Sequence, residues 1–153
     1  MTDHGFSNQH MTTALVLARD AMAEGEVPVA AIITNAEGEV IAKASNRVER
    51  DGDPTAHAEM LAIREAVAQL GQQRLNDCDL WVTLEPCPMC AGAIAHARLR
   101  RVYYGAEDPK SGGVSHGARV FNHPTCHHKP EVYSGISGEA ASQLLKEFFQ
   151  SKR

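Results

Sequence analysis

The sequence predicts an α/β fold with three layers (α/β/α), in which helices cover both faces of a mixed five-stranded sheet. Segments with helical spacing of apolar residues alternate with short β-branched runs along the chain. Only the turn "NAEGE" separates the first two strand-like runs, which predicts an antiparallel hairpin, whereas helices separate the later runs, as in parallel βαβ units. With 153 residues and no internal repeat or linker, the chain is expected to form one domain over residues 1–153.

The first half of the chain is expected to hold the hairpin and two helices. The expected elements are a helix at 8–24, strands at 27–34 and 40–45, a polar loop at 46–54 and a helix at 55–71. Asp53 or Thr55 can cap the second helix, because both side chains accept hydrogen bonds from free helical N–H groups. Pro54 suits its first turn, and Gly71 is typical of a helix end.

The second half continues the alternation of strands and helices. The expected elements are a strand at 79–84, a helix at 88–98, a strand at 101–106, a glycine-rich loop at 107–113, a short helix within 117–121, a strand at 130–135 and an amphipathic helix at 137–153. Phe148 and Phe149 are neighbours in the last helix, so we expect only one of them to pack into the core.

Composition limits the location and the partners. The chain has no run of about 18 apolar residues and its N-terminus lacks the pattern of a signal peptide, so we expect a cytoplasmic protein. The formal net charge of −4 argues against nucleic acid as a partner, but Arg98, Arg100 and Arg101 lie close together. A local basic patch and an ordinary mixed surface therefore both stay open.

Three residues have the spacing of a metal site. His57 opens one helix, and Cys87 and Cys90 open another directly after a strand, so two such turns side by side would bring the three together. Two thiolates and an imidazole suit one Zn²⁺ per chain. Three protein ligands leave a position for water, as in catalytic zinc sites, and Glu59 can then exchange a proton with that water.

Other interpretations compete for the same cysteines and histidines. Cys87 and Cys90 could be a redox pair of the thioredoxin type, although that leaves His57 and Glu59 unexplained. A second metal site could form in "NHPTCHH", from the four side chains His123, Cys126, His127 and His128, but the two prolines indicate an irregular loop. Cys78 is expected to be a buried structural cysteine.

The motifs "HAE" and "PCPMC" resemble the H-x-E and P-C-x-x-C signature of the zinc-dependent base deaminases. The outer motifs "EVPV", "SNR", "DPTAHAE", "RRVYYGAEDPKSGG" and "LLKEFF" are similar in order and spacing to the bacterial tRNA-specific adenosine deaminases, over roughly residues 10–152. The resemblance implies a cytidine deaminase-like fold and deamination of the wobble adenosine of a tRNA anticodon loop to inosine. It also implies a homodimer.

The same resemblance implies roles for individual residues. The zinc ligands would be His57, Cys87 and Cys90, with Glu59 moving protons while zinc-bound hydroxide attacks C6 of adenine. The residues expected at the substrate are Asn46, Ala58, Pro86, Asp108, Lys110 and Phe149.

Two other functions stay open at this point. A deaminase of a free base or nucleoside, such as guanine or cytosine, would carry the same zinc motifs, although it has less need of the 107–113 loop and the aromatic last helix. A zinc-stabilised RNA-binding module without catalysis would leave Glu59 without a role.

Overall fold

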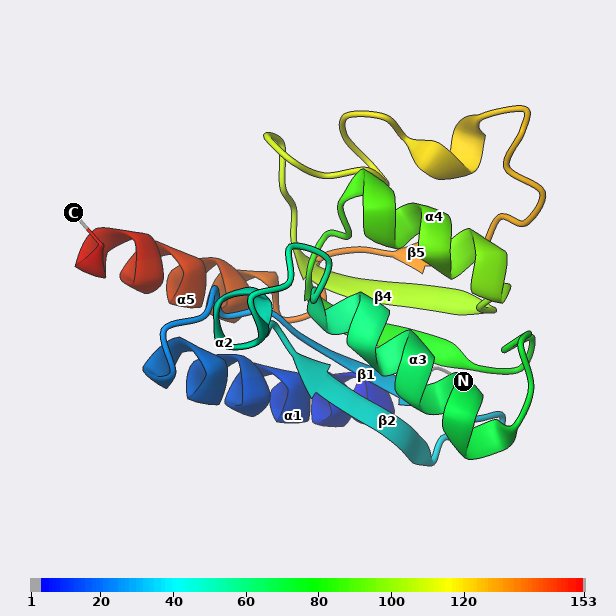
Figure 1. Cartoon of the computed structure of the whole chain (residues 1–153), viewed down its shortest axis with the longest axis horizontal. Helices are drawn as coiled ribbons and strands as arrows, with labels where there is room; N and C mark the ends of the chain where they lie inside the picture. The colour runs from blue at the N-terminus through cyan, green and yellow to red at the C-terminus, as the bar shows by residue number, and fades with distance from the viewer. Residues whose placement is uncertain (1–3, 153) are drawn as a thin grey trace.

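The computed structural model describes residues 4–152, and its five strands form one sheet in the order β2-β1-β3-β4-β5 (Figure 1). The strands are β1 at Ala30–Thr34, β2 at Val40–Ser45, β3 at Asp79–Leu84, β4 at Arg101–Ala106 and β5 at Glu131–Tyr133. β1 pairs antiparallel with β2 and β3, whereas β3, β4 and β5 run parallel, which confirms the mixed sheet. Residues 1–3 and 153, at the ends of the predicted domain, lie outside the described residues.

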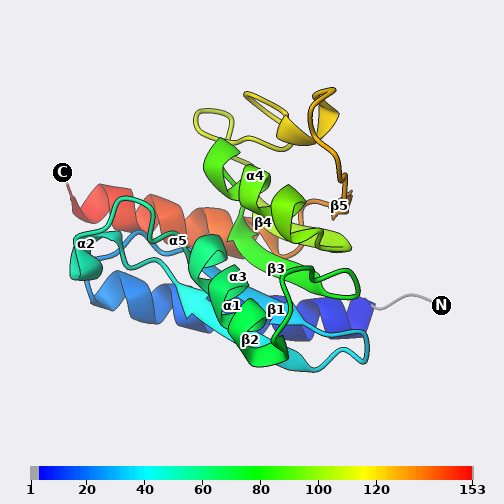
Figure 2. The ribbon, with the colours of Figure 1, turned by 45° about the vertical axis from the view of Figure 1, so that its right-hand side comes forward.

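Helices cover both faces of the sheet, as predicted (Figures 1 and 2). One layer consists of α1 (His4–Ala23) and α5 (Gly138–Ser151), and the other of α3 (Ala58–Leu70) and α4 (Pro88–Ala97). Two short helices, α2 (Val48–Asp51) and η1 (Val120–Asn122), lie in the connections. None of the helices within residues 4–152 is long and apolar enough to cross a membrane.

Each helix layer has its own hydrophobic core against the sheet. Successive side chains of β3 point to opposite faces, so Leu80 packs toward α3 and α4 while Trp81 packs toward α1 and α5. Trp81 stacks on Tyr103 of β4 with the ring centroids 3.8 Å apart. Because both faces are covered, nearly every residue of the central strands β1 and β3 is buried, instead of every second one.

The start of α3 differs from the prediction. Neither Asp53 nor Thr55 caps the helix; the Asp53 carboxylate instead accepts hydrogen bonds from the Thr55 N–H and hydroxyl, both at 2.8 Å. This local turn holds residues 53–55 outside the helix, so Pro54 is not in its first turn and His57 is the N-cap residue. Gly71 ends the helix in the left-handed conformation, as predicted.

Other details of the predicted elements also differ, and two of them have a clear physical reason. β1 begins at Ala30 rather than 27, because Pro28 has no N–H and the Val29 N–H donates to the Val27 carbonyl instead of a neighbouring strand. The predicted polar loop at 46–54 contains α2, whose four residues are too few to give a periodic pattern.

The arginines at the start of β4 are neutralised locally. Arg100 donates two hydrogen bonds to Asp79, at 3.0 and 2.9 Å, and Arg101 lies 3.8 Å from the same carboxylate. Arg101 also approaches Glu131 at 3.5 Å. Two of the three clustered arginines are therefore paired with acids, and a free basic patch does not form around them.

Candidate metal centre

The ends of two helices bring the three predicted metal ligands together. His57 is the N-cap residue of α3, Cys87 is the N-cap residue of α4, and Cys90 lies in the first turn of α4. Both N-cap residues have extended backbone conformations, which turn their side chains toward the space between the helix starts. The His57 Nδ1 atom lies 3.5 Å from the Cys87 Sγ atom and 3.6 Å from the Cys90 Sγ atom.

These distances fit a zinc ion. Tetrahedral zinc with bonds of about 2.3 Å to sulfur and about 2.0 Å to nitrogen places an imidazole nitrogen about 3.5 Å from each thiolate. Among the side chains that the structure describes, those of His57, Cys87 and Cys90 form the one group of three or more possible metal ligands whose ligand atoms converge within 4.8 Å. The donor set, two sulfurs and one nitrogen, is one that zinc prefers.

The pKa values of the Cys87 and Cys90 thiols shift in opposite directions. Hydrogen bonding with Cys90 and the nearby His57 lower the pKa of Cys87 to about 4, against the opposing effect of burial. The hydrogen bond with Cys87 and burial raise the pKa of Cys90. One thiolate therefore forms readily, whereas a second beside it requires a divalent ion to balance its charge.

Glu59 lies in the first turn of α3, two residues after His57, with 4% of its surface exposed. Burial is the main cause that raises the pKa of Glu59 to about 7. No lysine or arginine forms a salt bridge with it among the described residues. A buried acid without such a partner is costly, which indicates a chemical rather than a stabilising role.

Asn46 joins the metal centre to the preceding loop. Its Oδ1 atom accepts a hydrogen bond from the Ala58 N–H at 3.3 Å, which leaves its NH₂ group as a donor for a ligand. Arg50 holds the Asn46 carbonyl at 2.8 Å, and the buried Glu26 in turn binds Arg50. The sequence predicted Asn46 and Ala58 as substrate residues, which stays a prediction, but it gave no sign of Glu26 and Arg50, whose side chains pair across 24 positions.

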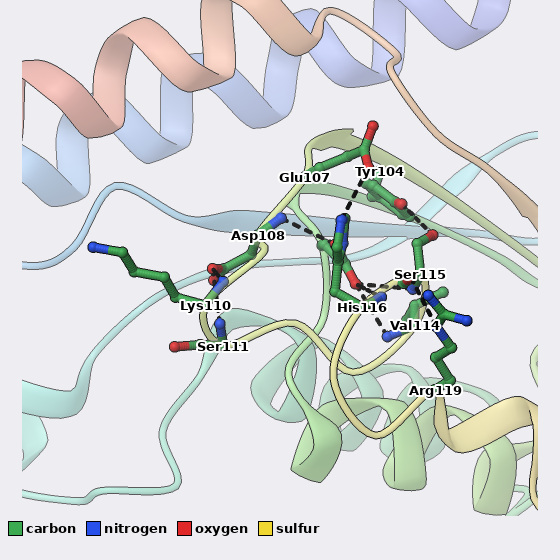
Figure 3. Close-up of polar contacts among 10 residues, drawn as sticks. Tyr104, Glu107, Asp108, Lys110, Ser111, Val114, Ser115, His116 and Arg119 are labelled. Atoms are coloured by element: carbon green, nitrogen blue, oxygen red, sulfur yellow. Dashed lines mark hydrogen bonds and ion pairs between the residues drawn. The ribbon is translucent and has the colours of Figure 1, made fainter.

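Glu85 is a second functional residue that sequence reasoning missed. It lies between β3 and Pro86, and its carboxylate accepts hydrogen bonds from the backbone N–H groups of Asp108, Val114, Ser115 and His116 at 2.9 to 3.2 Å (Figure 3). The His116 Nδ1 atom lies 2.8 Å from it. Burial alone would raise the pKa of Glu85, but these donors bring it below its usual value. No signal near Glu85 in the sequence could have found it, because its donors lie 23 to 31 positions further along the chain.

An open groove brings together three of the predicted substrate residues. Asp108 and Lys110 from the 107–113 loop and Phe149 from α5 line a groove of about 680 Å³, together with Leu84. Phe149 is 52% exposed, whereas Phe148 is 7% exposed, so one phenylalanine is core as predicted. The Asp108 side chain also accepts the N–H groups of Lys110 and Ser111, which shapes the loop.

The loop "NHPTCHH" does not assemble a metal site among the described residues. Its ring nitrogens and its thiol contact backbone carbonyls instead: His123 contacts Ala118 at 2.6 Å, and His128 contacts Leu99 at 2.7 Å. The Cys126 thiol donates to the His128 carbonyl at 3.2 Å. These side chains hold the irregular loop on the fold. Cys78 is buried, as predicted.

Comparisons with known proteins point to one family. Residues 5–106 match the family model "Cytidine and deoxycytidylate deaminase zinc-binding region". The tRNA-specific adenosine deaminase of Agrobacterium fabrum is 52% identical over 94% of this chain and 93% of its own length. The corresponding protein of Aquifex aeolicus is 47% identical over the same shares.

Two solved structures represent different substrates within this fold. A structure from work on A-to-I editing by tRNA:A34 deaminases superposes with a TM-score of 0.87, at 52% identity, over 90% of this chain and 99% of that one. The guanine deaminase of Nitrosomonas europaea superposes with a TM-score of 0.79, at 27% identity, over 92% of this chain and 83% of its own.

Proposed function

The chain belongs to the cytidine and deoxycytidylate deaminase family of zinc-dependent enzymes, and on that basis we propose that it converts the wobble adenosine of a tRNA anticodon loop to inosine. The observation that carries this proposal is its 52% identity to a tRNA-specific adenosine deaminase over nearly the whole of both chains. The groove lined by Lys110 and the exposed Phe149 supports it, because such an open groove suits a flexible RNA loop.

His57, Cys87 and Cys90 would hold the zinc ion, which would lower the pKa of a bound water and so make hydroxide available at neutral pH. The family and the converging donor atoms both support this ligand set.

Glu59 moves the protons in the proposed reaction. Its carboxylate takes a proton from the attacking water and passes it to N1 of adenine while the water oxygen bonds to C6. A second transfer through Glu59 protonates the exocyclic amino group, which leaves as ammonia. Adenosine and water thus give inosine and ammonia. The position of Glu59, buried two residues from a metal ligand, supports this role.

The remaining residues position the substrate. The Asn46 NH₂ group donates to the nucleoside, since its oxygen is already bound to the Ala58 N–H. The backbone at Ala58 and Pro86 borders the base. Asp108, Lys110 and Phe149 contact the anticodon loop, whose unpaired bases leave the stack at low cost. We also propose that the protein works as a cytoplasmic homodimer, which sedimentation analysis at micromolar concentration tests.

A free-base deaminase is the second candidate, because the guanine deaminase of Nitrosomonas europaea shares the fold at 27% identity. The higher identity to tRNA-specific enzymes, over the full length, favours RNA. A non-catalytic zinc module is disfavoured, since it gives no reason to bury the acid Glu59 without a salt bridge to lysine or arginine among the described residues.

The test is conversion of an anticodon stem-loop that carries adenosine at the wobble position, with inosine read by sequencing. Glu59→Gln keeps the size of the side chain but cannot shuttle protons. We therefore expect the rate of conversion to fall at least about 100-fold, with one zinc per chain retained. Deamination of free guanine, with no conversion of the stem-loop, would refute the proposed substrate. Full activity of Glu59→Gln would refute the proton shuttle.

A further inference from the structure

A buried carboxylate anchors the loop that forms one wall of the groove. The 107–116 loop contains no helix or strand, yet four of its backbone N–H groups are directed at the Glu85 carboxylate (Figure 3). The His116 ring adds a fifth donor, because a carboxylate can only accept and Nδ1 must therefore carry the proton. The Glu85 side chain has no exposed surface, so water does not substitute for these contacts.

Two glycines let the loop pack directly onto this carboxylate and onto the start of α4. A Cβ atom at Gly112 would lie 2.4 Å from the Glu85 Oε2 atom, and one at Gly113 would lie 2.5 Å from the Pro88 nitrogen. The Gly113 N–H also donates to the Pro86 carbonyl at 2.8 Å. The glycine-rich sequence "SGG" therefore serves close approach to Glu85 rather than flexibility.

The anchored loop carries the groove residues outward. The Asp108 N–H donates to Glu85, and the Asp108 side chain accepts hydrogen bonds from the N–H groups of Lys110 and Ser111. Asp108 therefore links residues 110 and 111 to the Glu85 carboxylate. Asp108, Lys110 and Ser111 all line the groove, as does Phe149. Their position therefore depends on Glu85, although Glu85 itself does not line the groove.

We propose that Glu85 is a positioning residue for RNA binding: it holds the 107–116 loop as a rigid wall of the groove, and so governs the KM for RNA rather than the chemistry at the metal. This inference rests on the proposed function, because RNA is the ligand assigned to the groove.

The test compares Glu85→Gln with the wild-type protein in steady-state kinetics on the wobble-adenosine stem-loop, with zinc measured in each sample. Whichever way the new amide turns, at least two of the five donors lose their acceptor. We expect the KM to rise about tenfold or more, since leaving charge-assisted donors unpaired is costly, while kcat stays within about threefold and zinc content is unchanged. An unchanged KM, or a loss of zinc and kcat at constant KM, would overturn the proposal.

Two further variants separate positioning from general damage. Gly112→Ala crowds the same carboxylate without removing it, so we expect the same rise in KM. Asp79→Asn is the matched control, because Asp79 is also a buried, hydrogen-bonded carboxylate. It is the first residue of β3, whereas Glu85 follows the last one, so the two lie about 20 Å apart along the strand. A rise in KM for Asp79→Asn equal to that for Glu85→Gln would assign the effect to destabilisation and refute the positioning role.

Hydrogen exchange separates this inference from the proposed function. In Glu85→Gln we expect faster amide exchange at Asp108, Val114, Ser115 and His116, with β3 and β4 still protected. If the wild-type protein does not convert RNA, the proposed function fails, and RNA is no longer the ligand assigned to the groove. Hydrogen exchange still decides in that case whether Glu85 holds the loop. If the wild-type protein is active and exchange is unaltered in the variant, the positioning role alone fails.

Discussion

Glu26→Ala should destabilise the protein by removing the buried acid that supports the Asn46 loop. The Glu26 carboxylate accepts the Glu49 N–H at 3.2 Å, the Arg50 N–H at 2.7 Å and the Arg50 Nε–H at 3.2 Å. Its side chain is 1% exposed and that of Arg50 is 24% exposed, so water rescues the loss only in part. We expect a cost of about 3 kcal/mol, because charge-assisted contacts to a buried acid are lost.

For a domain of this length, that cost corresponds to a fall in melting temperature of about 6 to 12 °C, measured by circular dichroism on zinc-loaded protein at pH 7. Glu24→Ala is the control, since Glu24 is exposed and should change the melting temperature by less than about 2 °C. A melting temperature of Glu26→Ala within 2 °C of the wild type would refute the reasoning.

The difference in melting temperature between the wild-type protein and Glu26→Ala should depend on pH. Burial on its own raises the pKa of Glu26, but the hydrogen bonds from Arg50 and Glu49 bring it below its ordinary value. The folded state therefore binds this proton less readily than the unfolded state, and the stabilisation is present above the ordinary glutamate pKa of about 4.3. The difference in melting temperature should be full at pH 7 and should narrow as the pH falls below about 4.

The remaining predictions concern the last helix and the metal. Phe149→Ala should raise the KM for the stem-loop without changing the melting temperature, whereas Phe148→Ala should cost about 3 kcal/mol in thermal unfolding because its ring is buried. Removal of zinc by a chelator should abolish turnover and lower the melting temperature, and added Zn²⁺ should restore both, because the ion binds the folded site. Cys126→Ser should retain one zinc per chain by elemental analysis, whereas Cys87→Ser should lose it; equal retention would contradict the ligand set.

Local patterns predicted most elements of the fold because their causes are local. The runs at 40–45, 79–84 and 101–106 became strands over the predicted residues, because β-branched and aromatic residues favour strands. Those at 79–84 and 101–106 are buried on both faces of the sheet, whereas the edge strand at 40–45 is partly exposed. The start of α3 was wrong by three residues because two competing local signals, a helix cap and a turn at Asp53, use the same side chain. Only the folded chain decides between them.

The sequence alone predicted that His57, Cys87 and Cys90 come together at the starts of two helices, and the structure confirms that convergence. The role of Glu59 beside them stays a prediction. Glu26 and Glu85 were decided only by the tertiary structure. Each is an acid whose donors lie 23 to 31 positions further along the chain, so nothing near it in the sequence distinguishes it from a solvated surface residue. Burial gives these carboxylates their role, because a buried charge must collect every available donor, and burial is a property of the packed fold.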